Sequence, residues 1–192
     1  MHHHRFELAR RVPYSGSLDA GRERLITAKS EPVFGCVYKL VAVEDKDGNI
    51  VPKIKISENV GKITTPHFKK LYRFYGRDTG KAIADYLTVY DETVDDSQNL
   101  EIFDPDATWK RKEVYHFEAR ELLVPIYQKG KLVYKRPGIE EIKKYCTEQV
   151  DTLWDEVKRF DNPHNYYVDL SQKLYDIKTE LLNEKNERYE KN

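Results

Sequence analysis

The stretch that decides the fold covers residues 37–56 and reads VYKLVAVEDKDGNIVPKIKI. Two runs rich in tyrosine and β-branched residues flank Asp47-Gly48. An Asp-Gly pair between such runs favours a tight hairpin turn, because both central residues of that turn need a positive φ. In Lys53–Ile56 lysine alternates with isoleucine, which predicts one face toward a core and one toward water. The stretch is therefore predicted to form a β-hairpin.

Two further pairs of β-prone runs show the same organisation. The paired runs are residues 71–75 with 81–90, around a glycine-containing turn at 76–80, and residues 121–127 with 132–134, around Lys129-Gly130. Hairpins that follow one another along the chain favour an antiparallel meander. The region 24–136 is therefore predicted to consist mainly of β-hairpins.

The region 137–185 has the periodicity of helices instead. Apolar residues recur about every 3.6 residues over 139–160, up to the stop signal Asp161-Asn162-Pro163. A second helix is predicted to begin with Asp169 as its N-cap and Gln172 at the capping-box position. Each amphipathic helix needs a surface to cover, and the hairpins supply one. The predicted fold class is α+β, an antiparallel β-hairpin meander followed by two amphipathic helices.

The two ends of the chain differ from the region between them. Residues 1–23 open with Met1-His2-His3-His4. Imidazoles can bind metals, but no cysteine or carboxylate stands at ligand spacing, so the run is interpreted as derived from a purification tag. Small, polar and turn-forming residues fill Pro13–Gly21, which predicts a flexible or weakly docked segment. Residues 186–192 are predicted to be a polar tail.

The composition excludes several classes of protein. The 192 residues carry 33 Lys+Arg and 33 Asp+Glu, so no net charge steers the chain toward nucleic acid or an anionic membrane. No apolar run is long enough to span a bilayer. Two cysteines, Cys36 and Cys146, stand in unlike contexts, which excludes a disulfide scaffold and favours the reducing cytoplasm. Both are predicted to be packing residues.

The charge is balanced overall but segregated along the chain. Residues 53–81 hold eight basic and two acidic residues with aromatic residues among them, whereas residues 85–106 hold eight acidic residues and no Lys or Arg. Three interpretations fit the basic block: a nucleic-acid surface, a small phosphate site built from Ser57, Lys62 and Thr64, or a solvated hairpin face offset by the acidic stretch. The acidic stretch would repel a long polyanion, which disfavours nucleic acid and leaves the other two open.

No self-contained active site is predicted. The histidines His67, His116 and His164 belong to different elements. No nucleophile elbow, phosphate-binding Walker loop or dinucleotide glycine fingerprint occurs. We therefore expect no catalytic residue and no metal site in this chain.

Several short motifs resemble, in the same order, the C-terminal third of bacterial nicotinate phosphoribosyltransferases, and the resemblance covers residues 24–185. The motifs are Arg24–Pro32, Gly35–Val41, Pro52–Asn59, Lys62–Thr64, Leu122–Pro125, Lys129–Lys131, Asn162–His164 and Val168–Leu174. Enzymes of that family join nicotinic acid to phosphoribosyl pyrophosphate, driven by ATP hydrolysis, and yield nicotinate mononucleotide for NAD synthesis. The resemblance implies a phosphoribosyltransferase with a barrel-like core, ATP and Mg for the whole enzyme, and a cytoplasmic homodimer.

The resemblance also implies which residues contact substrate. In the family, a Gly-x-Gly-Thr turn holds the ribose 5-phosphate, but the matching positions here read Gly21-Arg22-Glu23, and a carboxylate there repels phosphate. The catalytic histidine, the pyrophosphate-binding carboxylates and the nicotinate contacts of the family belong to the preceding two thirds of the enzyme. The chain is thus expected to bind no cofactor itself and to supply only a rim of candidate phosphate-binding residues. The candidates are Arg24, Thr27, Lys55, Ser57 and Lys62.

Two functions follow as hypotheses. In the first, the chain is the C-terminal portion of a nicotinate phosphoribosyltransferase, inactive alone, with the upstream catalytic portion as its partner. In the second, it is a non-catalytic structural or dimerisation domain, as its two amphipathic helices suggest. Neither hypothesis involves nucleic acid or a membrane as a partner.

Overall fold

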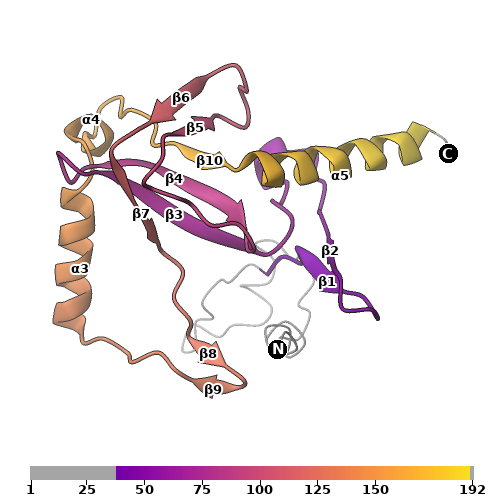
Figure 1. Ribbon diagram of the computed structural model, residues 1–192, viewed down its shortest axis with the longest axis horizontal. Coiled ribbons are helices and arrows are strands. Elements are labelled where there is room, and N and C mark those ends of the chain that lie inside the picture. Colours follow the sequence, from indigo (N-terminus) through magenta and orange to yellow (C-terminus); the bar gives the residue numbers. More distant parts are fainter. Residues whose placement is uncertain (1–37, 191–192) are drawn as a thin grey trace, which may run out of the picture. The chain divides into compact units, whose positions relative to one another are not determined.

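The structure is a computed structural model that describes residues 38–190, with side chains described as far as residue 184. The chain divides into two compact units, of which the larger comprises Leu40–Val124 and Lys135–Asn192. Figure 1 labels the elements of both. Each unit has its own secondary structure.

The smaller unit contains one described hairpin, β8 (Tyr127–Gln128) with β9 (Lys131–Leu132). The turn residues Lys129 and Gly130 both have a positive φ, 50° and 74°. This is the geometry that a two-residue hairpin turn requires, and only glycine adopts it without cost. The hairpin predicted at Lys129-Gly130 is confirmed, although its strands are shorter than the sequence suggested.

The larger unit is built on a four-stranded sheet. Its strands lie in the order β10-β4-β3-β7. They are β3 (Lys69–Gly76), β4 (Ala82–Val89), β7 (Phe117–Glu121) and β10 (Val168–Leu170). Strand β10 runs parallel to β4, whereas β3 is antiparallel to both of its neighbours.

Strands β3 and β4 form the hairpin predicted around residues 76–80. The turn closes where the Gly80 N–H donates to the Gly76 carbonyl over 2.7 Å, and Gly80 has a φ of 64°. The register places Phe74 opposite Ala84 of β4 and opposite Ala119 of β7. A large ring between two small residues lets the neighbouring strands approach while the ring itself is fully buried.

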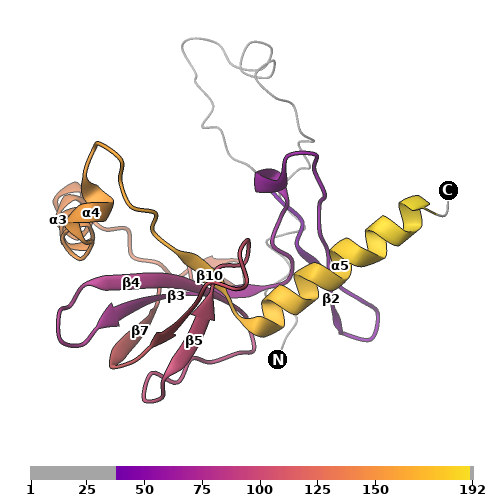
Figure 2. The same cartoon turned by 90° about the horizontal axis from the view of Figure 1, so that it is seen from above.

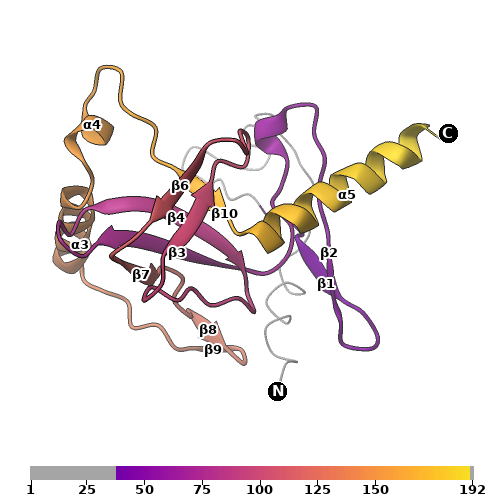
Figure 3. The ribbon, with the colours of Figure 1, turned by 45° about the horizontal axis from the view of Figure 1, so that its top comes forward.

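The main core lies between this sheet and a hairpin that was not predicted, formed by β5 (Leu100–Phe103) and β6 (Arg111–Val114). Figure 3 shows β5 and β6 crossing in front of the sheet. The Phe74 and Phe117 rings pack with their centroids 4.7 Å apart, and Ile102 and Val114 cover them from the hairpin. Aromatic pairs of this kind contribute about 0.5–1.5 kcal/mol beyond the burial of their area.

The first hairpin predicted from the sequence is also present, as β1 (Ala42–Glu44) and β2 (Ile50–Pro52). Gly48 has a φ of 85° in its turn. The Asp45 carboxylate accepts hydrogen bonds from the N–H groups of Asp47 and Asn49, at 2.9 and 2.8 Å. The turn is thus fixed by one side chain in addition to its glycine.

A half-buried lysine organises the entry into β3. The Lys69 ammonium donates to the carbonyls of Thr65, Pro66 and His67 at 2.9, 3.2 and 2.6 Å. His67 has a φ of 71°, which non-glycine residues rarely adopt. Burial lowers the pKa of Lys69 to about 8. The ammonium therefore holds a strained turn around itself.

The helical region differs from the prediction. A single helix was expected over residues 139–160, but α3 (Ile139–Asp151) ends before a short α4 (Asp155–Lys158). The break arises because Trp154 takes an extended conformation and its indole N–H donates to the Ala82 carbonyl over 3.1 Å. The Ala82 N–H in turn donates to the Thr152 carbonyl over 2.9 Å. The edge of the hairpin thus supplies the hydrogen bonds that interrupt the helix.

The side chains of α3 are not buried. Ile139, Ile142, Tyr145 and Val150 are between 46% and 69% exposed, and Cys146 on the same face is exposed as well. The prediction that Cys146 is a packing residue is therefore wrong for the described part of the chain, and Cys36 lies outside that part. The periodicity is present, but the described residues of its unit do not cover the apolar face of the helix.

The start of the last helix also differs from the prediction. Asp169 lies in strand β10, and α5 (Gln172–Glu190) begins after Ser171, whose hydroxyl accepts from the Leu174 N–H over 3.2 Å. Ser171 is therefore the N-cap, and Asp169 is not, because pairing with β4 holds residue 169 in a strand. The helix also continues past residue 185, through part of the segment predicted as a polar tail.

The predicted meander is only partly present. The α+β class is confirmed, and Figure 2 shows α5 leaving the end of β10. The three predicted hairpins, however, belong to three separate sheets, and β7 and β10 join the central sheet from distant parts of the sequence. Sequence patterns could not reveal this, because short strands at the edge of a sheet carry too few residues to show a period.

A prediction for stability concerns the ion pair at the centre of the sheet. Arg73 of β3 and Asp85 of β4 stand directly opposite each other and form two hydrogen bonds, of 2.7 and 2.9 Å. Both side chains are largely buried. The substitution Arg73→Met leaves the Asp85 charge without its cation, so we expect the free energy of unfolding in urea to fall by about 3 kcal/mol.

The matched control is Lys143→Met, which breaks an exposed ion pair with Glu140 on α3. We expect that change to cost less than about 1 kcal/mol. The double variant Arg73→Met/Asp85→Leu removes both buried charges and should recover part of the stability lost. Equal losses for Arg73→Met and Lys143→Met would contradict the assignment of a buried, structural ion pair.

Candidate functional site

Three of the five candidate phosphate-binding residues lie in the described part of the chain. Lys55, Ser57 and Lys62 occupy one loop, which spans residues 55–64. The loop is closed at its ends, because the Lys55 N–H donates to the Thr64 hydroxyl over 2.9 Å and the Thr64 N–H donates to the Lys55 carbonyl over 3.3 Å. The structure thus brings these three residues onto one closed loop. Arg24, Thr27 and the turn at residues 21–23 lie outside the described residues.

The loop is shaped by a single turn of 3₁₀-helix, η1 (Val60–Lys62). The side chain of Asn59 caps it by accepting from the Gly61 N–H over 3.0 Å. Lys55 and Lys62 are exposed and Ser57 is half-buried. Two ammonium groups and a hydroxyl on one loop are donors that suit a phosphate, and their binding of phosphate stays a prediction. Thr64 differs, because its hydroxyl oxygen already serves to close the loop.

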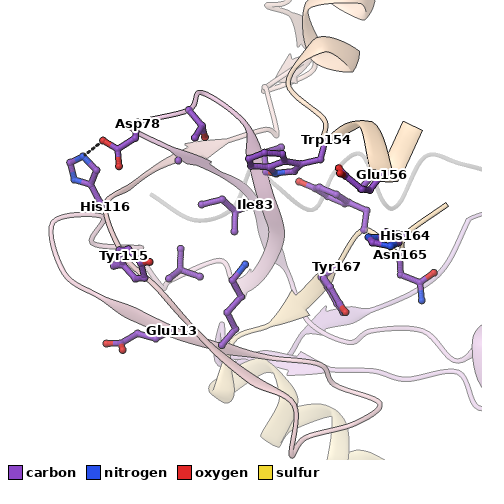
Figure 4. Close-up of a pocket in the computed structure, with 17 residues that line it drawn as sticks. Asp78, Ile83, Glu113, Tyr115, His116, Trp154, Glu156, His164, Asn165 and Tyr167 are labelled. Carbon is purple, nitrogen blue, oxygen red and sulfur yellow. Dashed lines mark hydrogen bonds and ion pairs between the residues drawn. The ribbon is translucent and has the colours of Figure 1, made fainter. Parts of the chain in front are cut away.

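A cavity of about 670 Å³ lies elsewhere in the larger unit. Its walls come from the β3–β4 turn, the end of β6, α4 and the segment before β10. Figure 4 shows Trp154 and Tyr167 on one side of it and His116 on the other. The cavity is therefore formed by four segments that are distant in the sequence.

One wall of this cavity carries a histidine–carboxylate pair. The His116 Nε2 lies 3.1 Å from the Asp78 Oδ1, and both side chains are more than half exposed. His116 has a φ of 50°. The Thr79 hydroxyl, which also lines the cavity, accepts from the Lys81 N–H over 3.2 Å. A histidine–carboxylate pair activates a nucleophile only when the nucleophile lies within hydrogen-bond reach of the ring. In the described part of the chain, the Thr79 hydroxyl is hydrogen-bonded to the Lys81 N–H and not to His116.

The opposite wall is aromatic and held in place. The Tyr166 hydroxyl donates to Asp85 over 3.0 Å, and the Arg73 guanidinium lies 5.7 Å from the centre of the Tyr166 ring. Burial, with the nearby Asp85 charge, raises the pKa of Tyr166. The phenol therefore stays protonated at neutral pH and cannot act as a base. Tyr166 links the buried ion pair of the sheet to this wall.

Among residues 38–184, whose side chains the structure describes, no group of three or more His, Cys, Asp or Glu side chains converges in a way that could hold a metal ion. None of the described helices is long and apolar enough to cross a bilayer.

Two buried acidic residues were missed as candidates by sequence reasoning. Asp85 pairs with Arg73, as described above. Asp169 is only 4% exposed, and burial raises its pKa to about 6, with a smaller contribution from Asp104. The available signal was an aspartate between Val168 and Leu170, an acidic residue inside a short apolar run. An aspartate just before an amphipathic run is equally typical of a helix N-cap, which is the role that the sequence pattern predicts for Asp169.

Comparisons with known proteins identify the relatives of this chain. The family model described as "Nicotinate phosphoribosyltransferase C-terminal domain" matches residues 68–178. The nicotinate phosphoribosyltransferase of Bacillus subtilis is 41% identical over 167 residues, which are 87% of this chain and 34% of the relative. That of Caenorhabditis elegans is 35% identical over 153 residues, 79% of this chain and 26% of the relative.

A solved structure has the same fold. The crystal structure of human nicotinic acid phosphoribosyltransferase superposes with a TM-score of 0.56 at 24% identity, over 62% of this chain and 24% of that one. The chain thus spans about a third of the length of the Bacillus subtilis relative. The matched residues 68–178 include the whole four-stranded sheet, the β5–β6 hairpin and the start of α5, and through this domain the chain belongs to the nicotinate phosphoribosyltransferase family.

Proposed function

We propose that this chain serves as the C-terminal portion of an enzyme that forms nicotinate mononucleotide from nicotinate and phosphoribosyl pyrophosphate, coupled to ATP hydrolysis, in NAD biosynthesis. The observation that carries the proposal is the match of the C-terminal domain model to residues 68–178. Identities of 41% and 35% to two enzymes of that name support it. The chain acts in the cytoplasm, as part of a larger enzyme.

The chemistry of the reaction belongs to the rest of the enzyme. The one histidine–carboxylate pair described, His116 with Asp78, is largely exposed. ATP and Mg bind to the remaining portion, which holds the catalytic residues. Phosphoribosyl transfer depends chiefly on positioning and on neutralising charge, and this chain contributes to both only at the rim.

The rim contribution comes from the loop of residues 55–64. Its lysines, Lys55 and Lys62, are exposed, and closure through Thr64 fixes the two ends of the loop. A closed loop loses less conformational freedom when it binds an anion than an open one does. Lys55, Ser57 and Lys62, together with Arg24 and Thr27, bind the phosphate groups of the substrate.

The remaining portion also explains the exposed face of α3. Among the described residues, hydrogen bonds join this helix to its own sheet near its C-terminal end, where Tyr75 donates to Gln149 over 3.1 Å and Lys81 donates to the Asp151 carbonyl over 2.7 Å. The apolar residues before that point are exposed. An apolar stripe at helical spacing needs a partner, and the barrel-like core of the same enzyme provides it. The whole enzyme is a homodimer.

A second candidate function is a structural or dimerisation domain with no part in substrate binding. The exposed face of α3 favours this function as well, since it requires a docking surface but no phosphate site. The two candidates differ in the role of the loop 55–64, which the variants below test.

The first experiment compares the chain alone with a chimaera. The chimaera carries this chain's residues 24–192 in place of the segment they match in the Bacillus subtilis relative. We expect the 192-residue chain alone to form no nicotinate mononucleotide from nicotinate, phosphoribosyl pyrophosphate and ATP, because it lacks the catalytic portion. The chimaera should turn over at a rate within about tenfold of the parent enzyme, since a folded domain keeps its site when supported by its own packing. Turnover by the chain alone, or a folded but inactive chimaera, would refute the proposal.

The second experiment tests the loop in the same chimaera. The double variant Lys55→Gln/Lys62→Gln removes two charge-assisted contacts to phosphate. We expect the KM for phosphoribosyl pyrophosphate to rise about tenfold or more with little change in kcat. The control is Lys53→Gln, an exposed lysine just outside the loop, which should leave both constants unchanged. An unchanged KM in the double variant would favour the purely structural function.

The third experiment tests the face of α3. Ile142 is 51% exposed, so Ile142→Lys should change the free energy of unfolding of the chain alone by less than about 0.5 kcal/mol. In the chimaera the same change places a charge in a docked apolar face, and we expect Tm to fall by at least about 4 °C. Lys144→Gln, on the exposed side of the same helix, is the control and should change neither measurement. A chimaera that tolerates Ile142→Lys would show that α3 is not a docking surface.

A further inference from the structure

A second, smaller cavity of about 190 Å³ lies beneath the β5–β6 hairpin. Its apolar lining includes Ile83 and Ala84 of β4 and Ile102 and Phe103 of β5. Asp169 of β10 also lines it. The cavity thus lies between the central sheet and the hairpin that covers the sheet, in a place distinct from the loop 55–64.

The Asp169 carboxylate lacks a partner within its own fold. The residue is 96% buried, since only 4% of its surface is exposed. Among residues 38–184, whose side chains the structure describes, no hydrogen bond or ion pair to its side chain is present, and its oxygens are not among the fully buried atoms that lack a partner. A buried carboxylate is normally paired or hydrogen-bonded, because desolvating a charge is costly. Asp169 is therefore an exception that needs a reason.

Three cationic side chains, those of Lys110, Arg111 and Lys112, also line the cavity, but none of them forms an ion pair with Asp169. Lys110 pairs with Asp104 at 3.8 Å, and the Arg111 guanidinium stacks over Phe103 with its central carbon 5.2 Å from the ring centre. Lys112 is exposed and acts on Asp169 only at longer range, where it slightly lowers the pKa. Tyr86, opposite Asp169 in the register, has its own pKa raised to about 12 by burial. The carboxylate thus faces the cavity without a committed cation.

We propose that this cavity binds a small organic cation, namely a primary ammonium group on a short aromatic or apolar stem, with the ammonium on Asp169 and the stem against Ile102 and Phe103. A volume of 190 Å³ is sufficient for such a stem, because an engineered apolar cavity of about 150 Å³ accommodates benzene. An ammonium–carboxylate contact in an apolar surrounding is a charge-assisted hydrogen bond, the stronger kind. The inference concerns a site separate from the proposed enzymatic function and does not depend on it.

The cost of Asp169 to stability supports a binding role. A folded-state pKa raised to about 6 from an ordinary value near 4 means that the unfolded chain releases this proton at lower pH than the folded chain does. The folded state is therefore favoured at low pH, and this contribution is lost as the pH rises through about 6. A side chain that destabilises its own fold at neutral pH is typical of a site kept for binding.

The test is a titration of the ¹⁵N-labelled 192-residue chain, followed by amide chemical shifts. The probes are benzylammonium, benzyl alcohol as its neutral match and benzoate as its anionic match. We expect benzylammonium to bind at least tenfold more tightly than benzyl alcohol, with shifts in β5, β6 and β10, and benzoate not to bind. Equal affinity for the ammonium and the alcohol, or shifts confined to other elements, would overturn the proposal.

Two variants and a pH series complete the test. Asp169→Asn should abolish the preference for the ammonium while leaving Tm equal or higher. The control is Asp106→Asn, an exposed aspartate in the loop between β5 and β6, which should leave the preference intact. In the unsubstituted chain, lowering the pH from 7.5 to 5.0 should weaken ammonium binding about tenfold, because a group with a pKa of about 6 becomes largely protonated over that range. If Asp169→Asn still prefers the ammonium, the assignment is overturned. An ammonium affinity of the unsubstituted chain that does not change with pH would also overturn it, and this second measurement does not depend on whether the variants fold.

Discussion

The pairing of β3 with β4 is the interaction on which the rest of the larger unit depends. These two strands are central, so that β7 can add to one edge and β10 to the other. Their pairing also places Arg73 directly opposite Asp85, and Tyr166 joins the pair from the segment before β10. One cross-strand ion pair therefore links the two central strands to a distant part of the chain.

The distant partners of this hairpin explain how the cavities arise. Strand β10 pairs with β4 in parallel, about 80 residues further along the chain, and the β5–β6 hairpin packs over the same face. Residues 111–117 lead from that hairpin back to the edge of β3. Parallel pairing requires a long connection, and here that connection carries α3 and α4. Both cavities lie where segments that follow β4 in the sequence pack against the β3–β4 hairpin.

The sequence predicted what local turn chemistry decides. The three hairpins at Gly48, at residues 76–80 and at Gly130 are all present because each turn contains its own conformational signal. Strand β10 and the break before Trp154 were missed, because hydrogen bonds to strand β4, which is distant in the sequence, decide each of them. For the candidate site, the sequence placed Lys55, Ser57 and Lys62 near one another, and the structure puts them on one loop; whether they bind phosphate stays a prediction. The isolation of Asp169 was not predictable, since burial without a partner is a property of the packed fold alone.

Positions where local chemistry conflicts with the fold of this domain indicate what the domain binds. An exposed apolar stripe on α3 and an unpartnered buried carboxylate at Asp169 are both unfavourable for an isolated domain. Elsewhere the rules agree: Phe74 is buried between small neighbours, and Lys69 is satisfied by three carbonyls. In natural sequences, local propensity, hydrophobic pattern and packing agree with the fold except where function requires otherwise. The two exceptions here differ in kind. The stripe is apolar and exposed and suits a protein surface, whereas the carboxylate lines a small, partly open cavity and suits a single cation.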